Sequence, residues 1–404
     1  KRDLEASERL LGPEHPDTNG TRFSLANLLS DQERYDESIP LRRLELEVAA
    51  KRDGRGAAGT LTSIHRLAED LYWNDELQDS EQLYREALNG RIAALGDDDG
   101  ATMASRYGLA RCLSEQERYA EAIELRRVEL AWCQSNDDVD AKDMLISMHG
   151  LGCDLLAAGE TEEALEVLQG CLIQRQQQLG TGDDDTLATL ARVLECYSSL
   201  GRQREGLALS QKTQEVLMAE LGENHPKVLS QLSNQASLHD ELGELEQAEA
   251  LYRRSLQCRE QALGADHADT LSTAFNLAET LSQQERHAEA IPLRRRELAW
   301  CRKENGDADA GTLTSISALA DDLKANGDPK AAEPLYRECL AGRIETLGDE
   351  HPSTMASRYD LANCLSSLGD SAEAIELRRI ELAWCQKEKG ADHPDTRASL
   401  EALA

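Results

Sequence analysis

The sequence of 404 residues is poor in aromatic side chains, which make up only 4% of it and include just two phenylalanines. It has no run of about 18 apolar residues, the length that a membrane-spanning helix needs, so no such helix is predicted. With a hydrophobic share of 40%, the chain is expected to bury a narrow seam of alanine and leucine instead of a thick core. No stretch alternates apolar and polar residues, so no β-strand is predicted.

The residue patterns of common catalytic and metal sites are missing as well. The ten cysteines form no Cys-x-x-Cys pair and show no metal-ligand spacing, so we interpret them as small hydrophobic residues in a reducing, cytoplasmic compartment. The sequence contains no Gly-x-x-x-x-Gly-Lys-Ser/Thr phosphate loop, no Gly-x-Ser-x-Gly elbow and no His-Glu-x-x-His pair. We therefore expect no enzyme activity, no cofactor and no metal site.

Positive charge is scarce, because 44 Lys and Arg residues stand against 76 Asp and Glu residues, for a formal net charge of −32. Nucleic acids and anionic membranes would be repelled, so neither is expected as a partner. A basic peptide would be attracted; the alternative is that the acidic surface only keeps a long chain soluble. The acidic triplets 97–99 and 183–185 lack the spaced ligands of a calcium loop and are expected at helix N-termini.

The sequence does contain one strictly spaced repeat. The segment Gly12–Thr18, Gly-Pro-Glu-His-Pro-Asp-Thr, returns in stronger or weaker form every 42 residues without insertion or deletion. Threonine ends eight of the ten copies, and glycine opens nine of them. A fixed period of this length is typical of a solenoid, in which each repeat packs only against its neighbours.

Each repeat is predicted to form two antiparallel helices. Pro16 suits the first position of a helix, and Gly54 suits a left-handed position after the end of the second one. The helical pattern breaks at 31–34, and the second helix is expected from about Asp36 to Lys51. The expected apolar positions of this repeat are Leu25, Ala26, Leu28 and Leu29 in the first helix, and Ile39, Leu41, Leu44, Leu46 and Val48 in the second.

Two repeat positions carry small residues along almost the whole chain. One begins with Ala26, Ala68 and Ala110, and the other with Ser38, Ser80 and Ala122. With leucines at 25 and 29, this pattern resembles the tetratricopeptide repeat. The 42-residue period and the linker Leu-Gly-x-x-His-Pro-x-Thr, as in 347–354, resemble its kinesin-light-chain-type subclass.

This resemblance implies an all-α fold, a right-handed α-solenoid (superhelix) of about nine tandem 42-residue helix-turn-helix units. We expect a single solenoid over residues 1–404 with partial repeats at both ends. The expected repeats are 16–57, 58–99, 100–141, 142–183, 184–225, 226–267, 268–309, 310–351 and 352–393. Because the chain opens within a second helix and closes within a first one, we expect it to be a segment of a longer protein.

A second level of order appears in the second helices. One style reads Leu-Arg-Arg-x-Glu-Leu, as in 41–46, and the other reads Leu-Tyr-Arg, as in 83–85. The two styles largely alternate, and the stretches 60–134 and 312–386 share roughly six residues in ten, which indicates duplication of a block of repeats. The most divergent stretch, 142–223, is expected to pack more loosely or to bend.

The histidines are interpreted as structural. Five of them share one linker position and would lie on successive repeats, too far apart for one metal ion, so we expect them to form hydrogen bonds at helix starts. These five are His15, His225, His267, His351 and His393. Two others, His65 and His149, share a position of the first helix with aromatic residues and are expected to be surface-facing contact residues.

The resemblance implies a concave groove lined by the first helices, which in tetratricopeptide proteins holds an extended peptide or a partner helix. The implied groove positions are Phe23, His65, Tyr107, His149, Phe275 and Tyr359 at one level, Asn27, Glu69, Arg111, Glu195, Glu279, Asp321 and Asn363 at the next, and Tyr72 and Trp73 in the same band. Aromatic residues would anchor a ligand, and the acidic ones favour a basic ligand. The alternative is that these positions are solvated faces between packed helices.

Three tryptophans, Trp132, Trp300 and Trp384, recur in the second helices and are expected to pack between repeats. The primary functional hypothesis is a non-enzymatic scaffold that binds a protein or peptide in the groove. The second hypothesis is a sensor or regulatory arm of a larger signalling protein, because repeats of this subclass are often fused to nucleotide-binding or caspase-like domains.

Overall fold

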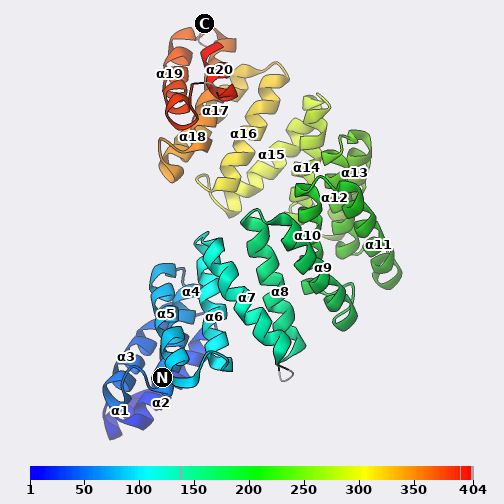
Figure 1. Cartoon of the computed structure of the whole chain (residues 1–404). Helices are drawn as coiled ribbons and strands as arrows, with labels where there is room; N and C mark the ends of the chain where they lie inside the picture. The colour runs from blue at the N-terminus through cyan, green and yellow to red at the C-terminus, as the bar shows by residue number, and fades with distance from the viewer. Residues whose placement is uncertain (137–138, 392, 402–404) are drawn as a thin grey trace. The chain divides into compact units, whose positions relative to one another are not determined.

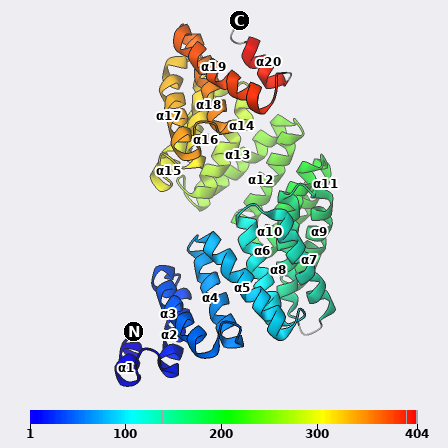
Figure 2. The same ribbon diagram turned by 60° about the vertical axis from the view of Figure 1, so that its left-hand side comes forward.

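A computed structural model describes residues 1–136, 139–391 and 393–401, and every regular element among them is an α-helix. The chain divides into two compact units, Lys1–Gly201 and Arg202–Ala404. Within each unit, every helix packs against the next one along the chain (Figures 1 and 2). The expected all-α solenoid of helix pairs is confirmed.

The helices of the first unit alternate between first and second helices of a repeat. They are α1 (Arg2–Leu11), α2 (Pro16–Ser30), α3 (Tyr35–Asp53), α4 (Ala58–Trp73), α5 (Leu77–Leu95), α6 (Gly100–Glu115), α7 (Tyr119–Ser135), α8 (Ala141–Ala157), α9 (Thr161–Gln178) and α10 (Asp184–Ser199). Even numbers mark first helices and odd numbers mark second helices.

The second unit continues this order. Its helices are α11 (Gln203–Leu221), α12 (Pro226–Glu241), α13 (Leu245–Ala262), α14 (Ala268–Gln283), α15 (His287–Glu304), α16 (Ala310–Ala325), α17 (Pro329–Leu347), α18 (Pro352–Leu368), α19 (Ser371–Glu388) and α20 (Pro394–Glu401). The divergent stretch 142–223 contains the boundary between the two units, and a bend there stays a prediction.

The linker histidines cap the first helices, as predicted. The Nδ1 atom of His15 accepts a hydrogen bond from the backbone N–H of Asp17 at 3.2 Å, so it satisfies a donor that has no partner within α2. The same bond recurs at His225, His267 and His351. Other repeats use an aspartate instead, such as Asp99 before α6 and Asp183 before α10. The acidic triplets therefore lie at helix N-termini, as expected.

The glycine that opens each linker differs in detail from the prediction. Gly54 has φ 85° and ψ 155°, and Gly12 has φ 92° and ψ 159°. Both have positive φ but are extended, not left-handed helical as expected, and this conformation is essentially confined to glycine. The threonine that ends the linker is fully buried, and the Thr354 hydroxyl donates to the Gly348 carbonyl at 2.8 Å.

The two small-residue positions form the core seam. Ala26, Ala68 and Ala110 are completely buried, as are Ser38 and Ser80. A larger side chain at either position would separate the paired helices, because both helices of a repeat meet there. The Leu-rich cores predicted from the sequence lie along this seam in both units.

Two predicted core positions were wrong. Leu28 in α2 and Leu44 in α3 are exposed, whereas Arg42 and Glu45 in α3 are only 3% and 6% exposed. The expected apolar stripe is rotated because these two charged residues point toward the neighbouring repeat and find polar partners there.

Candidate functional site: the faces of the first helices

The first helices of neighbouring repeats lie beside one another within each unit. Contacts join α4 to α6 and α8 to α10 in the first unit, and α12 to α14 in the second. The predicted groove residues stand on these first helices, and each of them is at least partly exposed. Neighbouring first helices therefore meet at these three places, and a groove along them stays a prediction.

An aromatic cluster surrounds one arginine on this surface. The guanidinium of Arg111 in α6 lies 4.2 Å from the ring centroid of Tyr72, 4.8 Å from that of Trp73 and 5.5 Å from that of Tyr107. The rings of Tyr72 and Trp73 meet edge to face at 5.2 Å. Trp73 remains 54% exposed, so the cluster offers a large apolar ring beside a cation held in place by stacking.

Other predicted aromatic anchors cover buried arginines. Phe23, Tyr107 and Phe275 each lie against the guanidinium of an arginine in the second helix of the same repeat. The guanidinium-to-centroid distances are 5.9 Å for Arg42 over Phe23, 5.8 Å for Arg126 over Tyr107 and 4.4 Å for Arg294 over Phe275. These rings therefore have a structural role, whether or not they also contact a ligand.

The buried arginines form ion pairs with the first helix of the following repeat. Arg42 pairs with Asp70, Arg126 with Asp154 and Arg294 with Asp322, and all six side chains are at most 6% exposed. The sequence reading missed these pairs. A detectable signal was present, because each Leu-Arg-Arg motif at these three places is followed by an aspartate 28 residues after its first arginine.

Several predicted polar groove residues are held by their own repeat. The carboxylate of Glu279 pairs with Arg294, Asp321 accepts a hydrogen bond from the Tyr336 hydroxyl at 2.5 Å, and the Asn363 side-chain oxygen accepts from an Arg378 guanidinium N–H at 2.8 Å. Burial also raises the pKa of Asp321, with the Tyr336 hydroxyl acting in the opposite direction. These contacts favour the structural alternative at these positions.

Three of the predicted residues do share one hollow. Asn27, Glu69 and Trp73 line a cavity of about 410 Å³ between α2, α3 and α4, together with the buried Arg42 and Asp70. Arg66 pairs with Glu69 across one turn of α4 at 2.7 Å. Glu195 pairs with Arg192 in the same way at 2.7 Å on α10.

His65 and His149 are more buried than expected. The His65 ring packs edge to face against Tyr84, with 5.4 Å between the centroids, and its Nδ1 lies 3.5 Å from the Ser105 hydroxyl. Burial, reinforced by the charge of Arg91, lowers the pKa of His65 to about 3, and burial lowers the pKa of His149 to about 4. Both histidines are therefore neutral at pH 7. They are partly buried, so a surface contact role for them stays a prediction.

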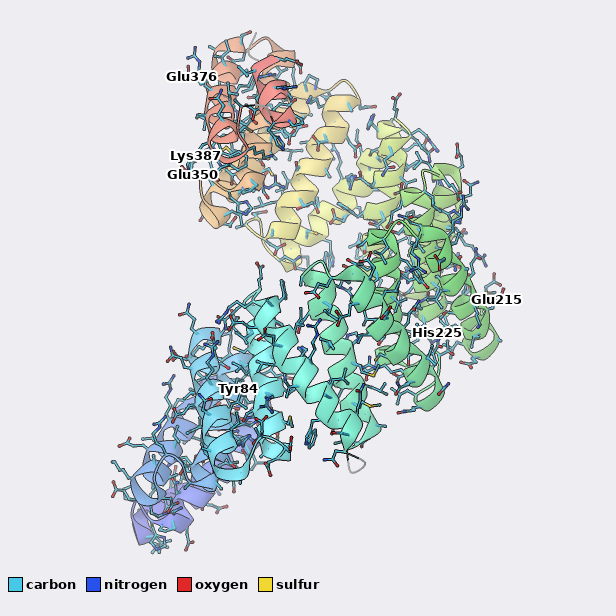
Figure 3. All side chains as sticks on the ribbon, in the orientation of Figure 1. Tyr84, Glu215, His225, Glu350, Glu376 and Lys387 are labelled. Carbon is cyan, nitrogen blue, oxygen red and sulfur yellow. The ribbon has the colours of Figure 1, made fainter. Side chains whose placement is uncertain are left out.

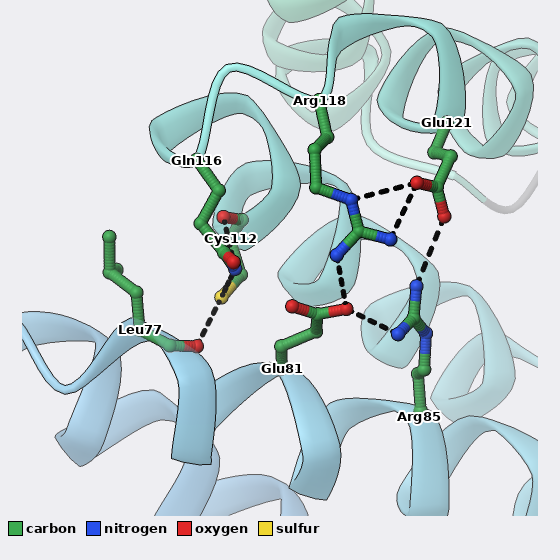
Figure 4. A network of polar contacts seen from close by, with 7 residues as sticks. All are labelled: Leu77, Glu81, Arg85, Cys112, Gln116, Arg118 and Glu121. Atoms are coloured by element: carbon green, nitrogen blue, oxygen red, sulfur yellow. Dashed lines mark hydrogen bonds and ion pairs between the residues drawn. The ribbon is translucent and has the colours of Figure 1, made fainter.

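The second helices carry a repeated ladder of ion pairs (Figure 4). Arg118 donates to Glu81 at 2.6 Å and to Glu121 at 2.8 Å, and Arg85 donates to Glu121 at 3.1 Å and also pairs with Glu81. The same four-residue network recurs with Arg253, Glu249, Arg286 and Glu289. Because most of these side chains are half-exposed, each pair contributes only about 0–1 kcal/mol.

Figure 3 draws the side chains on the ribbon and labels Lys387 and Glu350, and Lys387 donates to Glu350 at 3.1 Å. All ten cysteines are free, and eight of them are buried. Among the described residues no group of three His, Cys, Asp or Glu side chains could hold a metal ion. In the same part of the chain, no helix has the length and apolar character needed to cross a membrane.

Trp132 contacts the linker in front of its own repeat. Its Nε1–H donates to the backbone carbonyl of Asp98 at 2.8 Å. Trp132 therefore ties the second helix α7 to the segment before α6. Asp98 belongs to the preceding repeat, so this hydrogen bond is a contact between repeats, as expected for Trp132. Trp384 lies against Lys389, whose Nζ is 5.5 Å from the ring centroid.

Comparison with solved structures places this helical array among known repeat proteins. The apo form of the quorum sensor NprR from B. thuringiensis has a TM-score of 0.56 at 14% identity, over 94% of this chain and 99% of NprR. A Signal Transduction ATPase with Numerous Domains (STAND) protein with a tetratricopeptide repeat sensor, from Pyrococcus horikoshii, has a TM-score of 0.54 at 14% identity, over 96% of this chain and 55% of that protein. At these identities the likeness concerns the fold.

A putative kinesin light chain with nearly identical TPR-like repeats, from Podosopora anserina, is also similar, with a TM-score of 0.46 at 25% identity over 50% of this chain and 95% of that one. No curated protein sequence matches the chain. The tetratricopeptide repeat family model matches residues 59–127, 195–261, 228–303, 269–345 and 311–379, which together cover more than half of the sequence. The chain therefore belongs to the tetratricopeptide repeat family.

Proposed function

We propose that this chain is a non-enzymatic scaffold that binds a peptide or partner protein along the surface of its first helices. The observation that carries the proposal is the Arg111 cluster, in which Tyr72, Trp73 and Tyr107 surround one guanidinium while Trp73 stays exposed. Aromatic and arginine side chains held rigidly at a surface are the residues that most often dominate protein–protein binding. No comparable exposed aromatic cluster is recorded among the described second helices.

The surroundings of this cluster suit a macromolecular ligand better than a small substrate. The hollow at Asn27, Glu69 and Trp73 and the Arg111 cluster share Trp73, so they form one extended surface over α2, α4 and α6. The net charge of −32 favours a basic partner. The free, mostly buried cysteines support a cytoplasmic location for the chain.

Selection of binding peptides from a displayed random library, followed by affinity measurement with the purified chain, tests the proposal. The variant that combines Tyr107→Ala, Arg111→Ala and Tyr359→Ala is expected to lose binding while circular dichroism shows unchanged helicity. The control combines Arg85→Ala and Arg253→Ala, which alter two exposed arginines of the second helices. Unchanged affinity of the triple variant would contradict binding at the first helices.

The second candidate is a sensor or regulatory arm of a larger signalling protein. It is supported by the fold likeness to the P. horikoshii protein, whose tetratricopeptide repeats are named a sensor and of which this chain matches 55%. The full coding sequence tests it directly, since this candidate requires an effector domain, either nucleotide-binding or caspase-like, next to the repeats.

A further inference from the structure

A cavity of about 560 Å³ lies between α6, α7 and α8 in the first unit. Its walls include the aromatic rings of Tyr107 and Trp132, and its lining also contains Glu129, Asp140 and Asp143. None of the described residues that line it is a lysine or an arginine. The cavity therefore combines aromatic faces with carboxylates, which is the composition that favours a cation.

Glu129 is the central acidic group of this cavity. Its side chain enters from α7 and the residue is only 7% exposed. Oε1 accepts a hydrogen bond from the Ser147 hydroxyl at 2.7 Å, whereas no donor among the described residues reaches Oε2. A buried carboxylate oxygen without a donor is unfavourable, so a ligand that brings a donor to it would be stabilised.

The nearest arginines are each paired with another carboxylate, and Glu129 forms no ion pair with a described residue, although the charge of Arg126 acts on it. Arg126, whose guanidinium lies over the Tyr107 ring, is paired with Asp154, and Arg106 is paired with Asp97. At the start of α8, the Asp140 carboxylate accepts a hydrogen bond from the Lys142 backbone N–H at 2.9 Å, which offsets the positive end of that helix.

The equivalent cavity in the second unit contains a lysine. It has a volume of about 320 Å³ and is lined by Tyr359, Glu381 and Trp384, the residues 252 positions after Tyr107, Glu129 and Trp132. Its lining also includes Lys389, and the ammonium of Lys389 lies 5.5 Å from the Trp384 ring centroid, whereas Glu381 Oε2 has no donor among the described residues. The lysine of the second unit therefore packs on the aromatic wall of its cavity.

We propose that the cavity of the first unit binds a lysine or arginine side chain of the partner peptide, against Tyr107 and Trp132 and beside Glu129. This inference rests on the proposed peptide-binding function and specifies the chemistry of the ligand. The cationic head lies beside the Glu129 carboxylate, which attracts its charge, and its stem packs on the aromatic rings, as long basic side chains do on apolar surfaces. Burial raises the pKa of Glu129, and a bound cation would oppose that effect.

The test uses the whole chain and two peptide arrays of capped nonamers, one with a fixed central lysine and the other with norleucine at the same place. Affinities of the best lysine-centred peptide and of its norleucine analogue are then measured for the wild type and for Glu129→Gln. We expect lysine to improve binding to the wild type by about tenfold and to give no such gain in Glu129→Gln. Circular dichroism checks that the variant keeps its helicity.

The matched control is Glu45→Gln. Glu45 occupies the same repeat position and accepts a hydrogen bond from Ser63 at 2.9 Å, and its replacement changes the net charge equally. Because no aromatic pair accompanies Glu45, the preference for lysine should survive in this control. Lys389→Ala should open the second cavity and raise the stoichiometry of the lysine-centred peptide from one to two.

The inference is wrong if Glu129→Gln and Glu45→Gln weaken the preference for lysine equally, because the overall acidic field would then be responsible. It is also wrong if lysine-centred and norleucine-centred peptides bind alike. In that case, loss of binding in Arg111→Ala and in Trp73→Ala would still support the scaffold function, and only the cation pocket would be ruled out. If no peptide of either array binds, both the pocket and the scaffold proposal fail.

Discussion

The second helices α5 and α7 place different side chains at the same point of the core. In α5, Tyr84 packs in the apolar cluster that also contains Cys112 of the next first helix. In α7, the same repeat position holds Arg126, which pairs with Asp154 where the other repeat has cysteine. The two styles of second helix seen in the sequence are therefore two solutions for joining one repeat to the next, one apolar and the other ionic.

Two further positions, one helical turn apart, differ between these helices: α7 has Glu129 and Cys133 where α5 has Ala87 and Arg91. Glu129 in α7 accepts a hydrogen bond from the Ser147 hydroxyl at 2.7 Å, whereas in α5 the charged residue is Arg91, which donates to the Ser105 hydroxyl at 2.8 Å. A hydroxyl can serve both styles because it is both a donor and an acceptor. The comparison teaches that the repeat keeps a hydroxyl on the first helix fixed and changes the sign of the buried charge beside it.

The largest loss of stability is expected when Arg126, the buried arginine of the ion pair with Asp154, is removed. We expect Arg126→Leu to destabilise the first unit by about 3–5 kcal/mol, because the buried carboxylate of Asp154 would lose its counter-charge. Urea unfolding followed by circular dichroism measures this change. The double variant Arg126→Tyr with Asp154→Cys copies the Tyr84 and Cys112 pair and should recover most of the loss. If the double variant is no more stable than Arg126→Leu, the two styles are not interchangeable.

A pH titration of stability tests the first-helix position that holds Phe or Tyr in repeats with a buried arginine and His65 in the repeat of Tyr84. Repeats with a buried arginine carry Phe or Tyr there, whereas the repeat of Tyr84 carries His65, whose folded-state pKa is lowered to about 3 from the ordinary 6.5. As the pH falls, His65 therefore binds a proton in the unfolded chain before it does so in the folded chain. The free energy of unfolding is highest above pH 6.5 and decreases as the pH falls below that value. By pH 5 the loss should reach about 2 kcal/mol.

The same titration on His65→Phe isolates this effect. Phenylalanine occupies the equivalent position as Phe23 and Phe275, and it carries no titratable group. The difference in unfolding free energy between the variant and the wild type should grow in favour of the variant between pH 6.5 and pH 5. A difference that stays constant over this range would show that His65 is accessible to protons in the folded chain.

Local rules were enough to predict the repeat frame. The His-Pro linker specified helix starts, glycine specified the helix ends, and Ala26 with Ser38 specified where paired helices meet. These features depend on residues close in the sequence, so a pattern of 42 residues reveals them. Only the backbone conformation of the linker glycine was wrong in detail, because the structure uses an extended form with positive φ.

The buried charges and the site could not be predicted in the same way. Arg42 and Glu45 were not among the predicted core positions, because charged residues are rarely buried and their partners Asp70 and Ser63 lie in the next repeat. For the same reason Phe23 and Phe275 were interpreted as ligand anchors, although the structure places them over buried arginines. The Arg111 cluster was foreseen residue by residue, but its stacking joins two repeats and emerges only in three dimensions.

The smallest effect on stability is expected at Gly108 and Gly150, the first-helix glycines that face Tyr84 and Arg126. A methyl group on Gly108 would come within 2.3 Å of the Tyr84 ring, and one on Gly150 would come within 2.3 Å of the Arg126 guanidinium. A ring held in an apolar core cannot move aside, whereas the end of an arginine side chain can shift, so crowding should cost more at Gly108. Both substitutions gain about 1 kcal/mol of helix propensity, which offsets part of that cost.

We therefore expect Gly108→Ala to be less stable than Gly150→Ala by about 1 kcal/mol in urea unfolding. Equal stabilities would mean that the guanidinium of Arg126 is held by Asp154 as firmly as the tyrosine ring is held by the core.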